Sequence, residues 1–488
     1  MTLLCETLTA DSMAGLIAAR DAATAGDMLE LRLDGVEDLD VAGALAGRTR
    51  PVLVTCRPTW EGGRFNGTEE ERARILRDAL DRGAEYVDVE WKAACAASLI
   101  ARDRTRVVVS SHDFAGVPVD LEARVAAMRQ TGAATIKIAV AVSRLSDTLP
   151  LMAIGRDGGA VVVGMGDAGV PTRLLAARYG SRWTYAGNGV APGQIPAARM
   201  VSEFRYRQIG AATRLFGVIS TNAMHSASPA MHNAAFAAGG IDAAYIPLRA
   251  ADVDDFMAFA DGVGIDGASV TIPFKLDALR KASLATERAE VVGAANTLKR
   301  SGGRWEAANT DVEGFLAPLA TAYGELRGSR VSVLGAGGSA RAVVAGLRSR
   351  DAVITIHARR AEQAEQVSEL GGAVGPWPPA ARSWDLLVNT TPLGGAALRD
   401  VSPLPGGPFD GRLVYDLTYG PGTSALLREA AAAGCATLDG LPMLVAQAER
   451  QFEWWTGVKP VSGVMREAAR QRLGLTDATE TQRHGVSS

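Results

Sequence analysis

The sequence of 488 residues predicts an α/β protein, in which an N-terminal (β/α)8 barrel precedes a second α/β unit with a Rossmann-type lobe. Eight strand-like apolar runs alternate with helical patterns over residues 1–212, which is typical of a parallel sheet. The pattern then restarts, and a strand, a glycine-rich turn and a helix follow one another at 330–347. At about 150 residues per domain, the length itself favours about three units.

The predicted barrel strands are short, and helical patterns fill most of the gaps between them. The segment at 67–83 is such a helix, with Thr68 as N-cap, early glutamates and Gly83 at its end. Eight such units in about 210 residues predict a compact barrel. The expected strands are residues 3–8, 28–33, 51–56, 86–91, 106–110, 135–142, 160–164 and 182–186.

Lys137 stands between Ile136 and Ile138 in an apolar strand, where a cation needs an explanation. It could lie in water on an edge strand, or it could form a structural ion pair. A closed barrel has no edge strand, and a desolvated lysine loses its proton easily and forms Schiff bases with carbonyl compounds. Barrel enzymes act at the carboxyl ends of their strands. The polar residues at those ends are Glu30, Arg32, Arg57, Glu90, His112, Lys137 and, in a following loop, Arg173.

The first 210 residues or so resemble the type I 3-dehydroquinate dehydratases. The motifs are "LELRLD" (29–34), "TCRP" (55–58), "DVE" (88–90), "SSHDF" (110–114), "IKIA" (136–139), "PTR" (171–173) and "APGQ" (191–194). The resemblance implies that Lys137 forms the Schiff base and His112 transfers protons, with Glu90 orienting His112. It also implies that Glu30, Arg32 and Arg57 hold ring hydroxyls, Arg173 holds the carboxylate and Gln194 closes over the substrate. The simpler alternatives are a core histidine at His112 and a plain Glu90–arginine ion pair.

A nucleotide-binding turn is predicted at 330–347, "RVSVLGAGGSARAVVAGL". Gly335, Gly337 and Ala340 fill the pattern G-x-G-x-x-G/A, in which backbone N–H groups approach a pyrophosphate at a helix N-terminus. The next strand ends in Arg359 and Arg360 where an acidic residue would favour NAD. Arginine there can hold the 2′-phosphate of NADP, although two solvated arginines are the alternative.

Residues 213–472 resemble the shikimate dehydrogenases. The motifs are "HSASP" (225–229), "SVTIPFK" (269–275), "AANT" (294–297), "NTD" (309–311), "LGAGGSAR" (334–341), "NTTPLG" (389–394), "YDLTY" (415–419) and "DGLPMLVAQA" (439–448). The resemblance implies that Lys275 and Asp311 are the acid/base pair at the reacting oxygen. The implied substrate contacts are Ser226, Ser228 and Tyr419 near the carboxylate, and Thr271, Asn296 and Gln447 at ring hydroxyls. The implied NADP site comprises Gly335, Ala336, Gly337, Gly338, Ser339, Ala340, Arg359, Arg360, Asn389, Thr390 and Gly440.

Several positions depart from these family patterns. Val190 replaces a common lid serine in the barrel half, and Asn222 replaces a common proline near the carboxylate loop. The cofactor loop reads Ala358-Arg359-Arg360 where Asn-Arg-Thr is common, and Gly395 stands where methionine is frequent. We expect the departure at Val190 to affect one lid hydrogen bond and that at Asn222 to affect the carboxylate loop. The cofactor-loop departure is expected to shift the NADP/NAD ratio, and Gly395 to change the packing of the nicotinamide pocket.

Together the two resemblances imply two consecutive steps of the shikimate pathway on one chain, with 3-dehydroshikimate as the shared intermediate. A dehydrogenase that prefers quinate and a catalytically silent metabolite sensor are the alternatives, and two intact acid/base sets disfavour the sensor. The expected domains are the barrel at 1–212, a substrate lobe at 213–322 completed by 441–474, and an NADP-binding lobe at 323–440. A disordered tail is expected at 475–488.

The composition excludes several other functions. The net charge of −3 offers no basic field for nucleic acid or an anionic membrane, and no apolar run is long enough to span a bilayer. The four cysteines are scattered without metal-binding spacing, which predicts no metal site and fits a reducing compartment. The N-terminus lacks the regions of a signal peptide. We therefore expect a cytoplasmic protein with small-molecule substrates, and the sequence leaves its oligomeric state open.

Overall fold

The computed structural model describes residues 2–475, which form two compact units. The first unit comprises the chain up to Arg214 together with Ile246–Gly264. The second comprises Leu215–Tyr245 together with the chain from Ile265 onward. The tail expected at 475–488 lies outside the described residues except for Leu475. The finer division of the chain into three domains stays a prediction.

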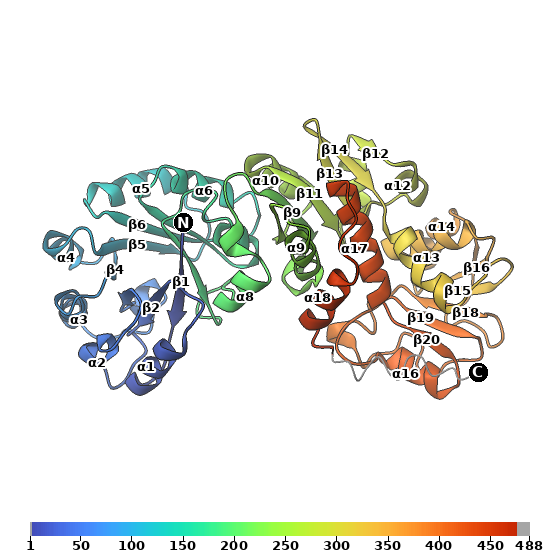
Figure 1. Ribbon diagram of the computed structural model, residues 1–488, viewed down its shortest axis with the longest axis horizontal. Coiled ribbons are helices and arrows are strands. Elements are labelled where there is room, and N and C mark those ends of the chain that lie inside the picture. The colour runs from blue at the N-terminus through green and yellow to red at the C-terminus, as the bar shows by residue number, and fades with distance from the viewer. Residues whose placement is uncertain (1, 476–488) are drawn as a thin grey trace. The chain divides into compact units, whose positions relative to one another are not determined.

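The first unit contains the predicted barrel of parallel strands, which is confirmed (Figure 1). The strands follow the order β7-β6-β5-β4-β3-β2-β1-β8, and a backbone bond from the N–H of Arg182 to the carbonyl of Ala160 links the starts of β8 and β7. The bounds differ from expectation chiefly at β5, which continues to Asp113. The strands are β1 (Leu3–Leu8), β2 (Met28–Arg32), β3 (Val52–Thr55), β4 (Tyr86–Glu90), β5 (Val107–Asp113), β6 (Thr135–Ala141), β7 (Ala160–Met165) and β8 (Trp183–Gly187).

Helices follow the strands and cover the outside of the barrel (Figure 1). They are α1 (Met13–Ala22), α2 (Val41–Leu45), α3 (Glu69–Asp81), α4 (Ala96–Arg102), α5 (Leu121–Gln130), α6 (Thr148–Arg156), α7 (Val170–Leu174) and α8 (Ala197–Ser202). The N-terminus of α3 has the predicted cap: the Thr68 side chain accepts from the N–H of Glu71, and the Glu71 carboxylate accepts from the N–H of Thr68. This capping box fixes the first turn of α3, which leads into the buried Arg72.

The substrate lobe of the second half has a mixed sheet in the order β10-β9-β11-β13-β14-β12. Its strands are β9 (Arg214–Ser220), β10 (Ala243–Arg249), β11 (Ile265–Val270), β12 (Leu284–Ala285), β13 (Thr297–Ser301) and β14 (Arg304–Ala308). Its helices are α9 (Ser228–Ala238), α11 (Lys275–Lys281), α12 (Glu287–Val292) and α13 (Asp311–Ala322). Helix α10 (Val253–Val263) falls in the first compact unit. The C-terminal helices α17 (Leu441–Thr456) and α18 (Val464–Arg472) return to this lobe, where Phe452, Trp455 and Met465 share a buried cluster with Phe216 and Phe236.

The predicted Rossmann-type sheet is confirmed as six parallel strands in the order β17-β16-β15-β18-β19-β20, which is the doubly wound order. The strands are β15 (Arg330–Leu334), β16 (Val353–His357), β17 (Ala373–Val374), β18 (Leu386–Asn389), β19 (Leu413–Asp416) and β20 (Ala436–Leu438). The helices are α14 (Gly338–Arg348), α15 (Ala361–Ser368) and α16 (Ala425–Ala432). Ligands bind such sheets at the carboxyl ends of the strands, where β15 leads into the glycine-rich turn.

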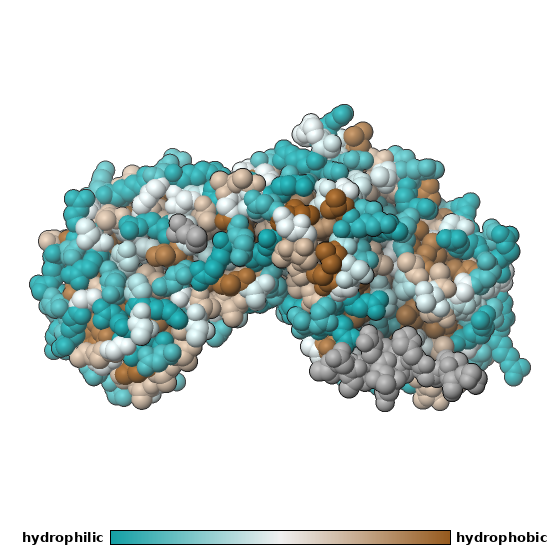
Figure 2. Space-filling model, viewed as in Figure 1, coloured by the Kyte–Doolittle hydropathy of each residue, from teal (hydrophilic) through white to brown (hydrophobic). Residues whose placement is uncertain are grey.

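The surface carries its hydrophobic side chains in small separate groups on the face seen in Figure 2. Among the described residues, no helix has the length and apolar character needed to cross a membrane.

Candidate active sites

A cavity of about 180 Å³ opens at the carboxyl ends of the barrel strands. Its wall brings together side chains from strands that are far apart in the sequence. Most residues expected at the barrel site line it: Glu30, Arg32, Arg57, His112, Lys137, Arg173 and Gln194. Glu90 is absent from this lining, and Glu61, Tyr185 and Val190 are part of it.

Lys137 projects from β6 into the barrel and is almost completely buried, with 6% of its surface exposed. Its Nζ lies 3.2 Å from Asp88 Oδ2 and 3.8 Å from Glu30 Oε1. The same nitrogen lies 4.3 Å from the centre of the Tyr185 ring. A side-chain nitrogen that lines the cavity and is this well shielded from solvent can reach a carbonyl group bound there.

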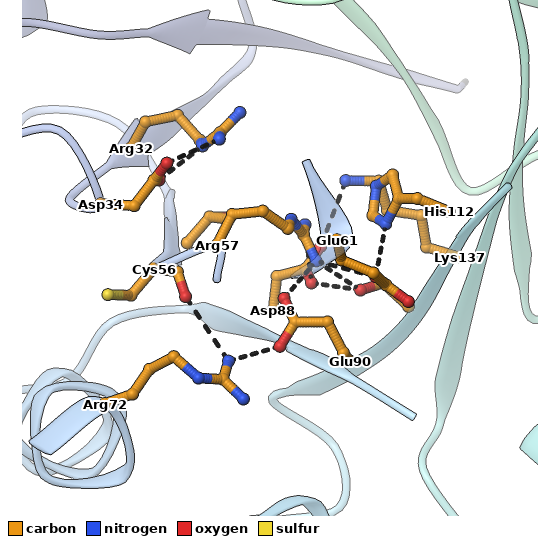
Figure 3. A network of polar contacts seen from close by, with 12 residues as sticks. Arg32, Asp34, Cys56, Arg57, Glu61, Arg72, Asp88, Glu90, His112 and Lys137 are labelled. Carbon is orange, nitrogen blue, oxygen red and sulfur yellow. Dashed lines mark hydrogen bonds and ion pairs between the residues drawn. The ribbon is translucent and has the colours of Figure 1, made fainter. Parts of the chain in front are cut away.

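His112 is hydrogen-bonded to Glu61 rather than to Glu90, which corrects the expected pairing (Figure 3). The distance from His112 Nδ1 to Glu61 Oε2 is 2.9 Å. Glu90 instead binds the Arg57 guanidinium at 2.5 Å and pairs with Arg72, so it forms the arginine ion pair that was also considered for this residue. His112 also lies within β5 and not beyond its end.

The carboxylates and the imidazole of this site differ in their protonation. Burial, reinforced by Arg57 and Lys137, holds the pKa of His112 well below its usual value. Burial also raises the pKa of Glu61 to about 7, although Arg57 opposes this shift. Burial acts in the same direction on Asp88, but there Arg57 and Lys137 prevail and hold its pKa far below the usual range. The site therefore combines a neutral imidazole with an ionised Asp88 beside the lysine.

The expected hydroxyl-binding residues are already held in place by protein contacts. Glu30 accepts hydrogen bonds from the hydroxyls of Thr7 at 2.9 Å and Thr55 at 2.8 Å. Arg32 forms two bonds to the Asp34 carboxylate, both 2.8 Å long. These contacts fix the side chains before a ligand arrives, which reduces the entropic cost of binding.

Arg173 is a buried cation, and one of its N–H donors is not hydrogen-bonded to any described residue. Only 1% of its surface is exposed, and its guanidinium donates to the carbonyls of Tyr185 at 3.2 Å and Pro192 at 3.3 Å. Its Nε has no hydrogen-bond partner among the described residues, and burial lowers the pKa of Arg173 to about 10. Both features favour binding of an anion from the cavity.

The loop that carries Gln194 lies over the same cavity. Gln194 donates to Thr7 Oγ1 at 3.3 Å and accepts from the N–H of Ala191 at 3.1 Å. Val190, which replaces the common serine, contributes only apolar surface to the wall.

The second half has a cavity of about 430 Å³ lined by residues of its substrate lobe and by residues of the Rossmann-type part, among them Ser339, Thr390 and Leu417. Asn222 and Gly395, two of the departures from the family pattern, also line it. The structure brings the expected acid/base pair and all expected substrate contacts into this one cavity: Ser226, Ser228, Thr271, Lys275, Asn296, Asp311, Tyr419 and Gln447.

Lys275 and Asp311 form a buried ion pair at the centre of this cavity, with Nζ 2.6 Å from Oδ2. Asn296 donates to the other Asp311 oxygen at 2.7 Å and to Gln447 Oε1 at 3.4 Å. The carboxylate of Asp311 fixes the position of the lysine ammonium, so that the remaining N–H groups of the ammonium point into the cavity. Lys275 can therefore give a proton to an oxygen bound there.

A groove of about 440 Å³ adjoins this cavity at the glycine-rich turn, and both share Ile272, Lys275, Ser339 and Thr390. At Gly335, with φ of 105°, an added Cβ would lie 2.6 Å from Thr390 Oγ1, so the turn requires glycine there. The N-terminus of α14 opens onto the groove, which fits a pyrophosphate. Of the residues expected to bind NADP, those lining the groove are Gly335, Ala336, Gly337, Gly338, Ser339, Arg359, Arg360 and Thr390.

Three expected cofactor residues lie elsewhere. Ala340 is buried in the core cluster of the Rossmann sheet, and Asn389 is buried with its amide donating to Leu393 O and Asp416 Oδ1, both at 2.9 Å. Gly440 lines the substrate cavity and not the groove.

Trp377, which the sequence reasoning missed, lines the groove. Among residues 2–475, no group of His, Cys, Asp or Glu is arranged to hold a metal ion.

Comparison with known proteins agrees with this geometry. Residues 4–211 match the family model of type I 3-dehydroquinase. Residues 218–298 match the shikimate dehydrogenase substrate binding domain, and residues 440–470 match the shikimate 5'-dehydrogenase C-terminal domain.

The bifunctional 3-dehydroquinate dehydratase/shikimate dehydrogenase of Arabidopsis thaliana, a chloroplastic protein, is 30% identical over 94% of this chain and 82% of its own length. The chain belongs to this bifunctional family. An NADP(+)-dependent shikimate dehydrogenase of Salinibacter ruber is 42% identical over 51% of this chain and 94% of its own length. A crystal structure of a shikimate dehydrogenase in complex with NADP+ is 31% identical, covers 54% of this chain and 97% of its own, and has a TM-score of 0.50.

Both resemblances inferred from the motifs are thus confirmed. The chain joins a 3-dehydroquinate dehydratase, a lyase, to an NADP-dependent shikimate dehydrogenase, an oxidoreductase. The barrel cavity lies in the dehydratase half of the chain. The larger cavity around Lys275 and the groove that adjoins it lie in the dehydrogenase half.

Proposed function

We propose that the barrel converts 3-dehydroquinate to 3-dehydroshikimate through a Schiff base on Lys137. The observation that carries this proposal is that one small cavity is lined by a buried lysine, by a histidine hydrogen-bonded to Glu61, and by Arg173, whose Nε has no hydrogen-bond partner among the described residues. Arg173 binds the substrate carboxylate, and Arg57, Arg32 and Glu30 bind its ring hydroxyls.

In the proposed mechanism, Lys137 Nζ attacks the ring ketone, and water leaves as the imine forms. The imine acidifies the neighbouring C–H bond, and neutral His112 takes that proton. His112 then returns the proton to the departing ring hydroxyl, so that water leaves and a C=C bond forms. Hydrolysis of the imine releases the product and restores Lys137. Glu61 takes the orienting role that the sequence reasoning gave to Glu90.

Borohydride reduction tests this mechanism, because it fixes an imine as a stable secondary amine. With 3-dehydroquinate or 3-dehydroshikimate present, we expect the ligand to become attached to Lys137, with a mass shift on the peptide that contains residue 137. Lys92, an exposed lysine of the same barrel, should stay unmodified. Peptide mapping that places the adduct elsewhere, or finds none, contradicts the Schiff base.

We propose that the second half reduces 3-dehydroshikimate in the cavity around Lys275. NADPH bound in the groove supplies the hydride. Lys275, held by Asp311, donates a proton to the oxygen that becomes the new hydroxyl. Ser226 and Ser228 bind the carboxylate with Tyr419 beside them, while Thr271, Asn296 and Gln447 position the ring hydroxyls. Comparing initial rates with quinate and shikimate distinguishes this role from a quinate dehydrogenase.

Arg359 and Arg360 are proposed to bind the 2′-phosphate of NADP, because both follow β16 and line the groove. Each charge-assisted contact contributes about 1.5–3 kcal/mol, so Arg359→Ala should lower the NADP/NAD ratio of kcat/KM roughly tenfold to hundredfold. Arg350→Ala is the control, since Arg350 is exposed outside the groove lining. Equal ratios for wild type and Arg359→Ala argue against this assignment.

We further propose that the protein works in the cytoplasm without a nucleic-acid or membrane partner. The four cysteines are free and buried, which fits a reducing compartment, and the net charge of −3 gives no field that attracts polyanions.

A further inference from the structure

Glu90 is completely buried and pairs with two arginines, Arg57 and Arg72 (Figure 3). One carboxylate oxygen accepts from Arg57 Nη1 at 2.5 Å, and the other pairs with Arg72 Nη1. Arg57 itself lines the cavity, whereas Arg72 and Glu90 do not. A buried carboxylate of this kind requires a full countercharge.

Arg72 brings that countercharge from α3, outside the strands of the barrel. It is fully buried, and Glu69 of the same helix holds Nε at 3.0 Å and Nη2 at 2.8 Å. The remaining nitrogen, Nη1, faces Glu90 and lies 3.5 Å from the carbonyl of Cys56. Since the capping box at Thr68 fixes this turn, the guanidinium has a defined position.

The charges alternate from α3 to the reacting groups. Arg72 pairs with Glu90, Glu90 with Arg57, and Arg57 with Asp88 at 3.0 Å and with Glu61 at 3.9 Å. Asp88 then contacts Lys137, and Glu61 contacts His112. The buried groups are close enough for a change at one end to reach the other through weakly screened Coulomb interactions.

We propose that Arg72 is a positioning residue for dehydration: it neutralises Glu90, so that Arg57 remains available to Asp88, to Glu61 and to the substrate. The inference rests on the proposed roles of His112 and Glu61. Without Arg72, the carboxylate of Glu90 has Arg57 as its only ion-pair partner among the described residues. The net negative charge around Glu61 then increases.

The groups that surround Glu61 set the direction of the effect. Arg57 lowers its pKa, whereas Glu90 and Asp88 raise it. The other titratable neighbours of the Arg72–Glu90 pair are Glu69 on α3, Cys95 before α4 and Cys56 after β3; burial raises the pKa of both thiols, so they stay neutral near pH 7. On the acidic side of the pH profile, kcat/KM falls as an essential group of the free enzyme becomes protonated. We call this side the acidic limb, and we assign it to Glu61, which must be ionised to hold His112. Loss of a cation therefore moves this limb to higher pH, and loss of an anion moves it lower.

The test compares pH profiles of dehydration for four variants of the full chain. Arg72→Met should move the acidic limb up by roughly 0.5–1.5 pH units, and Glu90→Gln should move it down. Arg72→Lys, which keeps the charge, should stay near wild type. The double variant Arg72→Met/Glu90→Gln removes both charges, so its limb should return toward the wild-type position. If Arg72→Met does not fold, the downward shift of Glu90→Gln and the position of the double variant carry the test.

Arg20→Met is the matched control, because Arg20 is also a buried arginine of the barrel, but it bonds the carbonyls of Ala44 and Ala46, and its one carboxylate partner among residues 2–475, Asp21, is exposed. We expect it to lower thermal stability without moving the limb. If Arg72→Met keeps the wild-type limb, if the double variant keeps the lowered limb of Glu90→Gln, or if Arg20→Met moves the limb as far as Arg72→Met does, Arg72 is structural only. Failure of wild-type dehydration, in contrast, rejects the proposed function itself.

Discussion

Replacing Lys137 by methionine should abolish dehydration of 3-dehydroquinate, with a loss of at least about 10⁴-fold in kcat. The physical reason is that only an amine can form the imine, and methionine retains the length of the side chain without its nitrogen. NADP-dependent oxidation of shikimate should remain near wild type, because Lys275 lies in the second unit with its own core. Both rates are measured on the same preparation.

Lys92→Met provides the control, since it removes an exposed barrel lysine whose Nζ lies over the Trp91 ring. It should preserve both activities. A folded Lys137→Met protein that still dehydrates its substrate contradicts covalent catalysis at this residue, and one that loses shikimate oxidation contradicts independent sites.

The Lys275→Met variant should show the reverse pattern. Removing the group that takes the proton from the reacting hydroxyl should lower shikimate oxidation by about 10²–10⁴-fold, the usual contribution of general acid–base catalysis. Asp311 keeps the hydrogen bond from Asn296 but loses its countercharge, so some loss of stability is expected as well. Dehydration at Lys137 should be unchanged.

Lys281→Met serves as the control on the same helix, because Lys281 is exposed at the C-terminal end of α11. Mixing the Lys137→Met and Lys275→Met proteins should restore conversion of 3-dehydroquinate to shikimate, with 3-dehydroshikimate diffusing between molecules. If either variant silences both reactions while still folded, the description of two separable active sites is wrong.

Much of this architecture could be predicted from the sequence because strands and helices have different hydrophobic periods. The barrel strands are short apolar runs, and the glycine-rich turn stands between a strand and a helix, where its function requires it. Lys137 was recognisable for the same reason, since a cation inside an apolar strand contradicts the pattern around it.

The pairing of His112 could not be read from the sequence in the same way. Asp88 and Glu90 lie two residues apart on β4 and share one face of the strand, so alternation could not rank them. Glu61 reaches His112 from the turn after β3, which folds back because the N–H of Gly63 bonds Pro58 O and the N–H of Phe65 bonds Arg57 O. An added Cβ at Gly63 would lie 2.1 Å from Arg57 O, so the turn depends on packing that no strand or helix period encodes.

The motifs of the cofactor site contain residues that line the groove and residues that only support it from behind. Gly335 and Gly337 shape the groove itself, whereas Ala340 packs α14 against the sheet and Asn389 fastens the turn after β18. Sequence patterns record both roles alike, because a residue that supports a binding turn is as constrained as one that touches the ligand.

The most direct test of two active enzymes on one chain uses the wild-type protein, 3-dehydroquinate and NADPH in a single cuvette. Dehydration should generate 3-dehydroshikimate, whose reduction then oxidises NADPH, so absorbance at the NADPH band should fall after a short lag and shikimate should accumulate in equal amount. Adding 3-dehydroshikimate directly should remove the lag. If NADPH stays reduced with 3-dehydroquinate but is oxidised with 3-dehydroshikimate, the barrel is inactive, and the account of two consecutive reactions on this chain is contradicted.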